Sequence, residues 1–182
     1  MSELTSFEGF PKIQRLSRQI VITEKIDGTN AQICITEDGQ FLTGSRTKWI
    51  TPENDNYGFS RWAHENKEEL MKLGIGRHFG EWYGAGIQRK YGLDEKRFSL
   101  FNSSRWNSDN TPKCCHVVPI LYNDIWVPGI EERCIEFLRT FGSVAVPGFD
   151  KPEGIVIYHI AGRCLFKKTL ENDEKPKGSK EV

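Results

Sequence analysis

Lys25 is the first residue of the sequence whose type and setting could support covalent chemistry. It lies in the polar segment Glu24–Asn30, which separates two runs of alternating apolar residues, and Asp27-Gly28 follows it closely. An amine that is held neutral and aimed at an electrophile can act as a nucleophile. A solvated lysine before a turn would give the same short pattern. The Lys-x-Asp-Gly spacing alone therefore leaves both interpretations open.

Further residues with useful chemistry follow Lys25, each at or near the end of an expected strand. They are Arg46, Glu81, Phe101, Glu153, Lys167 and Lys168. A guanidinium suits phosphate or ribose oxygens, because its planar fork donates to both. Carboxylates bind magnesium or manganese, and an aromatic face can stack on a base. No glycine-rich phosphate loop is present, so any phosphate would have to be held by side chains.

Composition limits the class of protein. The chain has 182 residues, which suits one domain, and 37% of them are hydrophobic, enough for a packed core. No apolar run is long enough to span a membrane, and residues 1–11 lack the features of a signal peptide, so we expect a cytoplasmic protein. The formal net charge is zero. Any nucleic acid would therefore be held in a local groove and not by the charge of the whole surface. Two basic pairs, Arg89-Lys90 and Lys96-Arg97, are either phosphate contacts or solvated loop charges.

The cysteines and histidines do not indicate a metal or disulfide framework. The five cysteines are an odd number at scattered positions. Cys114, Cys115 and His116 are adjacent, whereas tetrahedral zinc sites usually take spaced pairs of ligands. We expect reduced, structural cysteines, and the histidines show no metal or catalytic spacing.

Periodicity predicts a fold in which strands outnumber helices. Strands are expected at 20–22, 31–36, 41–45, 79–83, 98–102, 117–122, 154–160 and 163–170, and helical spacing covers 59–73 and 130–141. Asp38-Gly39 is typical of a hairpin turn, and Ala161-Gly162 marks a second turn. We therefore predict an α+β fold with mostly antiparallel sheets and flanking helices. The domain is expected to cover residues 1–170, and the charged segment 171–182 is typical of a solvated tail.

In their order, these elements resemble the motifs of the covalent nucleotidyltransferases, which include ATP-dependent RNA ligases, DNA ligases and mRNA capping enzymes. The matching segments are Lys25–Gly28, Gly44–Thr47, Gly80–Gly84, Phe98–Asn102, Glu153–Ile157 and Phe166–Thr169. The stretch Gly84–Gln88, with its Gly-Ile-Gln, is similar to RNA ligases in particular. The resemblance covers roughly residues 20–170. It implies a nucleotidyltransferase (adenylation) domain, and we expect no OB-fold or added C-terminal domain after it.

The resemblance implies an ATP-dependent RNA ligase. Lys25 would attack the α-phosphate of ATP to give lysyl-AMP and pyrophosphate. AMP would then pass to a 5′-phosphate, and a 3′-hydroxyl would displace AMP and seal the strand. The implied cofactor is Mg²⁺ or Mn²⁺, and the implied partner is RNA with 5′-phosphate and 3′-hydroxyl ends. A DNA ligase-like enzyme, a capping-like transferase that uses GTP, and a degenerate relative that only binds nucleotide or RNA stay open as alternatives.

The resemblance also implies roles for individual residues. Lys25 would be catalytic, and nucleotide contacts are implied for Glu24, Ile26, Arg46, Glu81, Gln88, Phe101, Glu153, Lys167 and Lys168. Glu81 would accept from the ribose hydroxyls, Phe101 would stack on adenine, and Glu153 would bind or position the metal. Asn102 departs from the aspartate that many RNA ligases have after the phenylalanine.

Strand alternation separates two adjacent pairs of candidates. Lys167 and Lys168 must point to opposite faces of their strand, whereas the family usually has lysines separated by one residue. We expect Lys167 to enter the site and Lys168 to meet nucleic acid or solvent. Phe98 alternates away from Phe101, which predicts a core position. Because nearby cations and burial both disfavour a charged amine, Lys167, Lys168 and the metal are expected to lower the pKa of Lys25.

Overall fold

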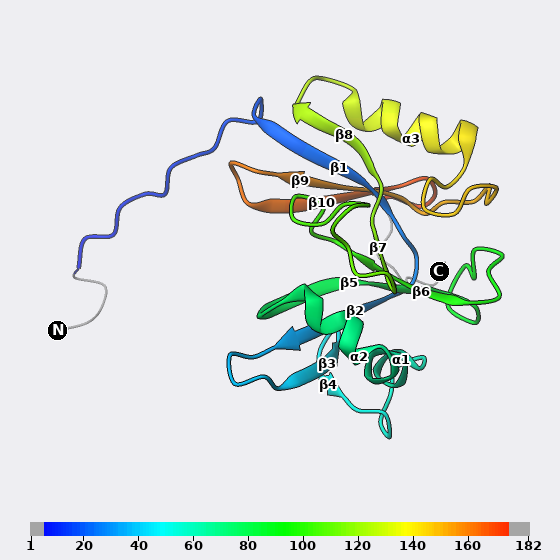
Figure 1. Ribbon diagram of the computed structural model, residues 1–182. Coiled ribbons are helices and arrows are strands. Elements are labelled where there is room, and N and C mark those ends of the chain that lie inside the picture. The colour runs from blue at the N-terminus through cyan, green and yellow to red at the C-terminus, as the bar shows by residue number, and fades with distance from the viewer. Residues whose placement is uncertain (1–5, 175–182) are drawn as a thin grey trace, which may run out of the picture.

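The computed structural model describes residues 6–174 and builds them around two β-sheets (Figure 1). The four-stranded sheet has the order β10-β9-β1-β8, with β1 at Gln19–Lys25, β8 at Ile120–Ile125, β9 at Gly154–His159 and β10 at Cys164–Thr169. The six-stranded sheet has the order β4-β3-β2-β5-β6-β7, with β2 at Thr29–Ile35, β3 at Phe41–Ser45, β4 at Trp49–Ile50, β5 at Gly76–Gly84, β6 at Lys96–Leu100 and β7 at Cys115–Val117. Neighbouring strands pair antiparallel except β6 and β7. The predicted α+β class with mostly antiparallel sheets is confirmed.

Helices cover one face of each sheet (Figure 1). The helix α3 (Ile130–Phe141) packs its apolar side on Ile20, Ile22 and Ile155 of the four-stranded sheet. The helices α1 (Phe59–Glu65) and α2 (Lys67–Leu70), with the 3₁₀ turn η2 (Met71–Leu73), cover the six-stranded sheet. The opposite face of each sheet carries no such helix and is called its inner face below.

A third apolar cluster lies where the chain passes from one sheet to the other. It contains Ile26, Tyr83, Tyr91, Val118 and Val146. Ile26 lies in the short connection between β1 and β2, while Tyr83 is on β5 of the other sheet. The cluster therefore fixes the end of β1, where the candidate nucleophile lies, against the six-stranded sheet.

Two expected elements differ from the structure. The helical spacing over 59–73 is divided at Asn66, whose φ of −104° leaves helical geometry, and η2 then ends at Gly74. The apolar run at 117–122 is split into β7 and β8 around Pro119. Proline has no N–H to donate to a ladder, but the Pro119 carbonyl oxygen accepts from the Glu24 backbone N–H at 3.0 Å.

The ends of the domain contribute little to the two sheets. Residues 6–18 form no strand or helix and are exposed, and residues 171–174 are exposed after β10. The rest of the expected tail, 175–182, lies outside the described residues. Within residues 6–174, no helix has the length and apolar character needed to cross a membrane.

Candidate active site

The end of β1 brings Lys25 into contact with Glu153. Lys25 lies opposite Gly154 in the β1–β9 ladder, so Glu153 immediately precedes the paired strand. The Lys25 ammonium donates to Glu153 Oε2, and this ion pair has a buried carboxylate. A Cβ on Gly154, whose φ is +156°, would lie 2.1 Å from the Lys168 carbonyl oxygen. The Glu-Gly pair in the sequence is therefore explained by close strand packing beside the lysine.

Glu81 is buried on the inner face of the six-stranded sheet. Its Oε1 accepts from the Gly28 N–H at 3.1 Å, and its Oε2 accepts from Asn30 Nδ2 at 2.9 Å. A Cβ on Gly28 would lie 2.3 Å from a Trp82 backbone oxygen, so only glycine allows this approach of the β1–β2 turn to β5. Burial raises the pKa of Glu81 to about 7, against smaller opposing effects of Asn30 and of the Lys25 charge. Both protonation states of the carboxyl group are therefore populated near neutral pH.

The turn that follows Lys25 is braced by side chains from the loop after β5. The Asp27 N–H donates to the Tyr91 hydroxyl at 2.7 Å. Arg89 Nε donates to Asp27 Oδ2 at 3.1 Å, and Arg89 Nη1 donates to the Lys151 carbonyl oxygen at 3.0 Å. Arg89 therefore joins the lysine turn to the segment that leads to Glu153. It had been a candidate phosphate contact or a solvated loop charge, and its contacts make it an internal bridge.

Glu24 points to the helix side of β1, on the face of Ile20 and Ile22. Its Oε1 accepts from the Ser143 hydroxyl at 2.6 Å, and its Oε2 accepts from the backbone N–H groups of Val144 and Ala145, each at 2.8 Å. Burial raises the pKa of this carboxyl group, with the hydrogen bonds opposing the shift. The carboxylate therefore holds the loop between α3 and β9, so a nucleotide contact of this residue would involve its backbone.

Lys167 and Lys168 lie on opposite faces of β10. Lys167 pairs in register with Val156 of β9, on the same inner face as Lys25. Lys168 lies on the helix side, where its Nζ donates to Glu132 Oε1 of α3 at 2.5 Å. The structure therefore brings Lys167 to the face that carries the candidate nucleophile and does not bring Lys168 there.

The remaining predicted residues are more dispersed. Arg46 is exposed immediately after β3, and Gln88 is exposed in the loop after β5 with a φ of +43°. Phe101 follows β6 on the inner face and is 40% exposed. Ile26 is buried in the third cluster, so its side chain is committed to packing. Phe98 is fully buried beneath α1, which confirms its predicted core position.

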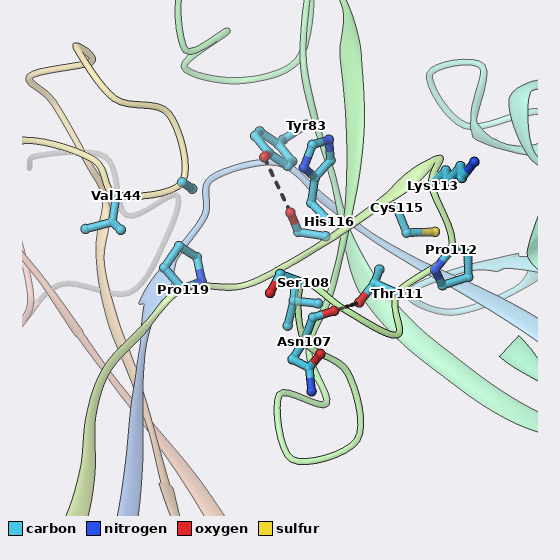
Figure 2. A pocket seen from close by; sticks show the side chains of 13 residues that line it. Tyr83, Asn107, Ser108, Thr111, Pro112, Lys113, Cys115, His116, Pro119 and Val144 are labelled. Atoms are coloured by element: carbon cyan, nitrogen blue, oxygen red, sulfur yellow. Dashed lines mark hydrogen bonds between the residues drawn. The ribbon is translucent and has the colours of Figure 1, made fainter.

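A cavity of about 470 Å³ opens beside β6 and β7 (Figure 2). Its lining residues are Tyr83, Ser99, Asn107, Ser108, Thr111, Pro112, Lys113, Cys115, His116, Val117, Pro119, Val144 and Ala145. The backbone of Glu24 contacts Pro119, and its carboxylate contacts Val144 and Ala145, so the cavity adjoins the end of β1. Apart from Tyr83 and Ser99, which lie in recognised motifs, the lining residues come from β7 and from separate loops, so no local pattern in the sequence predicted the cavity.

The described residues contain no group of three or more His, Cys, Asp and Glu side chains that could hold a metal ion. Magnesium is commonly bound by one or two carboxylates together with substrate phosphates and water. Glu153 offers such a carboxylate beside Lys25, and its charge also acts on Glu81. The donor set therefore fits a metal that arrives with a phosphate-bearing substrate and does not fit a metal held by protein alone.

The two sheets form the fold, and Lys25 with the carboxyl groups of Glu153 and Glu81 at their junction forms the candidate site. The sequence profile of the RNA ligase family matches residues 18–169, which is most of the chain. The chain therefore belongs to the RNA ligase family. No curated protein sequence matches it.

Solved structures of Naegleria gruberi RNA ligase share this fold. A mutant with ATP and manganese is 20% identical with a TM-score of 0.60, and the match covers 87% of this chain and 52% of that one. A second mutant with ATP and manganese gives 19% identity, a TM-score of 0.61, and coverage of 94% and 58%. A third mutant, with AMP and manganese, is 19% identical with a TM-score of 0.59, and the match covers 85% of this chain and 50% of that one. The chain therefore spans about half the length of these proteins, and the likeness at this identity shows the fold alone.

Proposed function

We propose that the chain is the adenylation domain of an ATP-dependent RNA ligase in which Lys25 accepts AMP. The contact between Lys25 and Glu153 carries this proposal, because it joins an amine and a carboxylate at the junction of the two sheets. Glu81 is close enough for the charges of both residues to act on its carboxyl group. Membership of the RNA ligase family supports the reaction class.

In the first step, Lys25 Nζ attacks the α-phosphorus of ATP. A P–N bond forms, the bond from the α-phosphorus to the bridging oxygen breaks, and pyrophosphate leaves with that oxygen. The amine must lose a proton before it attacks, and the carboxylate of its ion-pair partner Glu153 is positioned to accept one. Lys167, on the same inner face, would offset negative charge that builds on the phosphate.

In the later steps, a 5′-phosphate oxygen of RNA attacks the lysyl-AMP phosphorus, and the P–N bond breaks to release Lys25. A 3′-hydroxyl then attacks the activated 5′-phosphate, and AMP leaves as the phosphodiester bond forms. Lys167 would again lie beside phosphate charge in both steps. Its long side chain on the inner face suits contact with phosphates at successive positions.

Magnesium or manganese would be held by Glu153 together with phosphate oxygens of ATP. When bound, the metal would neutralise phosphate charge. Metal binding would also compete with Lys25 for the Glu153 carboxylate, because the two now form an ion pair.

The cavity beside β6 is our candidate for the site of the base. Its volume of about 470 Å³ lies within the range of small-ligand sites. Tyr83, Pro119 and Val144 supply apolar wall, and His116 supplies a polar group (Figure 2). Ser99 also lines the cavity. Phe101, the predicted stacking residue, is not among the lining residues. Two variants therefore test the two placements of adenine. Val144→Trp fills the cavity, and Phe101→Ala removes the predicted stacking ring. The variant that removes the true base site should raise the ATP concentration needed for half-maximal adenylylation.

The proposal is tested by incubation with ATP labelled at its α-phosphate and magnesium, followed by denaturing electrophoresis. Wild type and the exposed control Lys72→Ala should retain label, and Lys25→Ala should retain none. A folded wild-type protein that is not already adenylylated and takes no label would indicate a relative that only binds nucleotide or RNA. Labelled GTP tests the capping-like alternative, and nicked RNA against nicked DNA tests the DNA ligase-like one.

A further inference from the structure

An exposed row of side chains crosses the inner face of the six-stranded sheet next to the candidate active site. The ladders place Trp49 opposite Gly44, Gly44 opposite Gln32, and Gln32 opposite Phe79. The row therefore passes over β4, β3, β2 and β5. Trp49 is 46% exposed and Phe79 is 51% exposed. Two half-exposed aromatic rings on one sheet face are unusual, because large apolar side chains normally turn toward the core.

Polar groups fill the space between the two rings. Gly44 has no side chain, and the Gln32 side chain lies over it, since a Cβ there would be 2.8 Å from Gln32 Cγ. Arg77 Nη1 donates to Gln32 Oε1 at 3.3 Å, and the Arg77 guanidinium lies 5.3 Å from the centre of the Trp49 ring. Trp49, Gln32, Arg77 and Phe79 are called the aromatic strip below. It combines stacking faces, an amide and a cation.

The charge around the aromatic strip favours an anionic partner. The turn between β3 and β4 adds two exposed cations, Arg46 and Lys48, beside Trp49. Glu81 shares the inner face of β5 but is buried and accepts two hydrogen bonds from the chain. The exposed charges of Arg77, Arg46 and Lys48 are positive, which suits a phosphate backbone better than an apolar protein surface.

The aromatic strip is also continuous with the candidate active site. Phe79 and Glu81 lie two residues apart on β5, so their side chains leave the same face of the sheet. The Phe101 N–H donates to the Phe79 carbonyl oxygen at 3.0 Å, which continues the row toward β6. With strands about 4.8 Å apart, the row from β4 to β5 is roughly 14 Å wide, enough for two or three stacked or splayed nucleotides.

From this arrangement we infer that the aromatic strip binds unpaired nucleotides of an RNA strand next to the end being joined. Bases would stack on Trp49 and Phe79, the Gln32 amide would contact base edges or sugar hydroxyls, and Arg77 would contact phosphate. Stacking on aromatic rings beside cations is how many proteins hold single strands without strict sequence preference. The inference rests on the proposed ligase function for its choice of RNA end.

The test measures RNA binding and adenylylation separately on the full chain. Fluorescence anisotropy with a short, labelled, unstructured RNA gives the dissociation constant for wild type, Trp49→Ala, Phe79→Ala and the double variant. Each single substitution should weaken binding about 5- to 100-fold, because one stacked base is lost. Labelling by α-labelled ATP should be unchanged in all of them. The matched control is Phe141→Ala, since Phe141 is 70% exposed on α3, which packs on the four-stranded sheet.

Two further measurements keep the outcome decisive. Trp49→Phe retains an aromatic ring and should restore most of the RNA affinity that is lost in Trp49→Ala. A variant that loses RNA binding because it misfolds would also lose adenylylation. Arg77→Ala should reduce the dependence of RNA affinity on salt concentration, because one phosphate contact is removed.

The results separate failure of the aromatic strip from failure of the ligase proposal. Wild-type RNA affinity in the double variant would overturn the inference even when adenylylation is normal. RNA binding that depends on the strip in a protein without adenylylation would support the strip and reject the ligase. Concentration-dependent self-association that is lost in the double variant, with RNA affinity unchanged, would assign the strip to a protein interface and overturn RNA binding.

Discussion

Lys25 and Glu153 are 128 residues apart in the chain, yet they form an ion pair at one end of the β1–β9 ladder. An amine in such a pair carries a proton and cannot attack phosphorus. The pair therefore describes a resting form of the candidate nucleophile. In the proposed reaction the carboxylate would have to take the proton or turn to another cation, so Glu153 would control when Lys25 becomes reactive.

Glu153→Gln should lower the rate of adenylylation and raise the magnesium concentration needed for half-maximal rate by roughly tenfold or more. The amide keeps the shape of the side chain but can neither accept the proton nor bind the metal well. A magnesium titration of labelling by ATP measures both effects. Glu136→Gln, at an exposed ion pair on α3, is the control. A normal magnesium dependence in Glu153→Gln would remove this residue from metal binding.

Lys167→Ala should slow adenylylation about 100-fold, because a cation that faces the developing charge is lost. Lys168→Ala is the matched control, since its side chain leaves the other face of β10 and pairs with Glu132. It should label at the wild-type rate and lose little stability, as expected for a partly exposed ion pair. Slow labelling in Lys168→Ala with a normal rate in Lys167→Ala would show that the Lys168 face of β10 meets the nucleotide.

Glu81 should make nucleotide binding depend on pH near neutrality. Its pKa of about 7 means that the carboxylate, the stronger acceptor for ribose hydroxyls, becomes populated as the pH rises from 6 to 8. The ATP concentration for half-maximal labelling should fall over this range in wild type. In Glu81→Gln this ATP concentration should be higher than in wild type and should not change between pH 6 and 8. If the same pH-dependent change is present in Glu81→Gln, it arises from the titration of another residue.

The same residue should affect the pH dependence of stability. Because the pKa of Glu81 is higher in the folded chain than the ordinary value of 4.5, the folded state binds the proton more tightly. The free energy of unfolding should therefore fall as the pH rises from about 4.5 to 7. The whole fall should be on the order of 3 kcal/mol, and Glu81→Gln, which does not titrate, should lack it. Denaturant unfolding at pH 5 and pH 8 checks the difference.

Glu24→Ala should destabilise the fold by on the order of 3 kcal/mol. The change leaves the Ser143 hydroxyl and two backbone N–H groups of the α3–β9 loop without their acceptor. Urea unfolding measures the loss. Glu131→Ala at the start of α3 serves as a comparison on the same side of the sheet. Equal stability of wild type and Glu24→Ala would mean that water replaces the carboxylate.

The sequence predicted the elements whose pattern is local. The helix at 130–141 and the hairpin at 154–170 have clear apolar periods and turn residues, and both are present nearly as expected. Lys167 and Lys168 could be assigned to opposite faces because alternation depends only on adjacency. Three features depend on partners far along the chain and could not be predicted. They are the Glu24 contacts to the α3–β9 loop, the Arg89 bridge to Lys151, and the cavity beside β6.

The position of β9 and β10 has a consequence for how the protein is made. Lys25 is synthesised well before Glu153 and Lys167, which lie immediately before β9 and on β10, and β9 must pair directly with β1 to form the candidate site. Because a chain leaves the ribosome from its N-terminus, β1 lacks one neighbour until almost the whole domain has emerged. A growing chain therefore carries an incomplete candidate site, and the proposed attachment of AMP to Lys25 would begin only after β9 and β10 have joined the sheet.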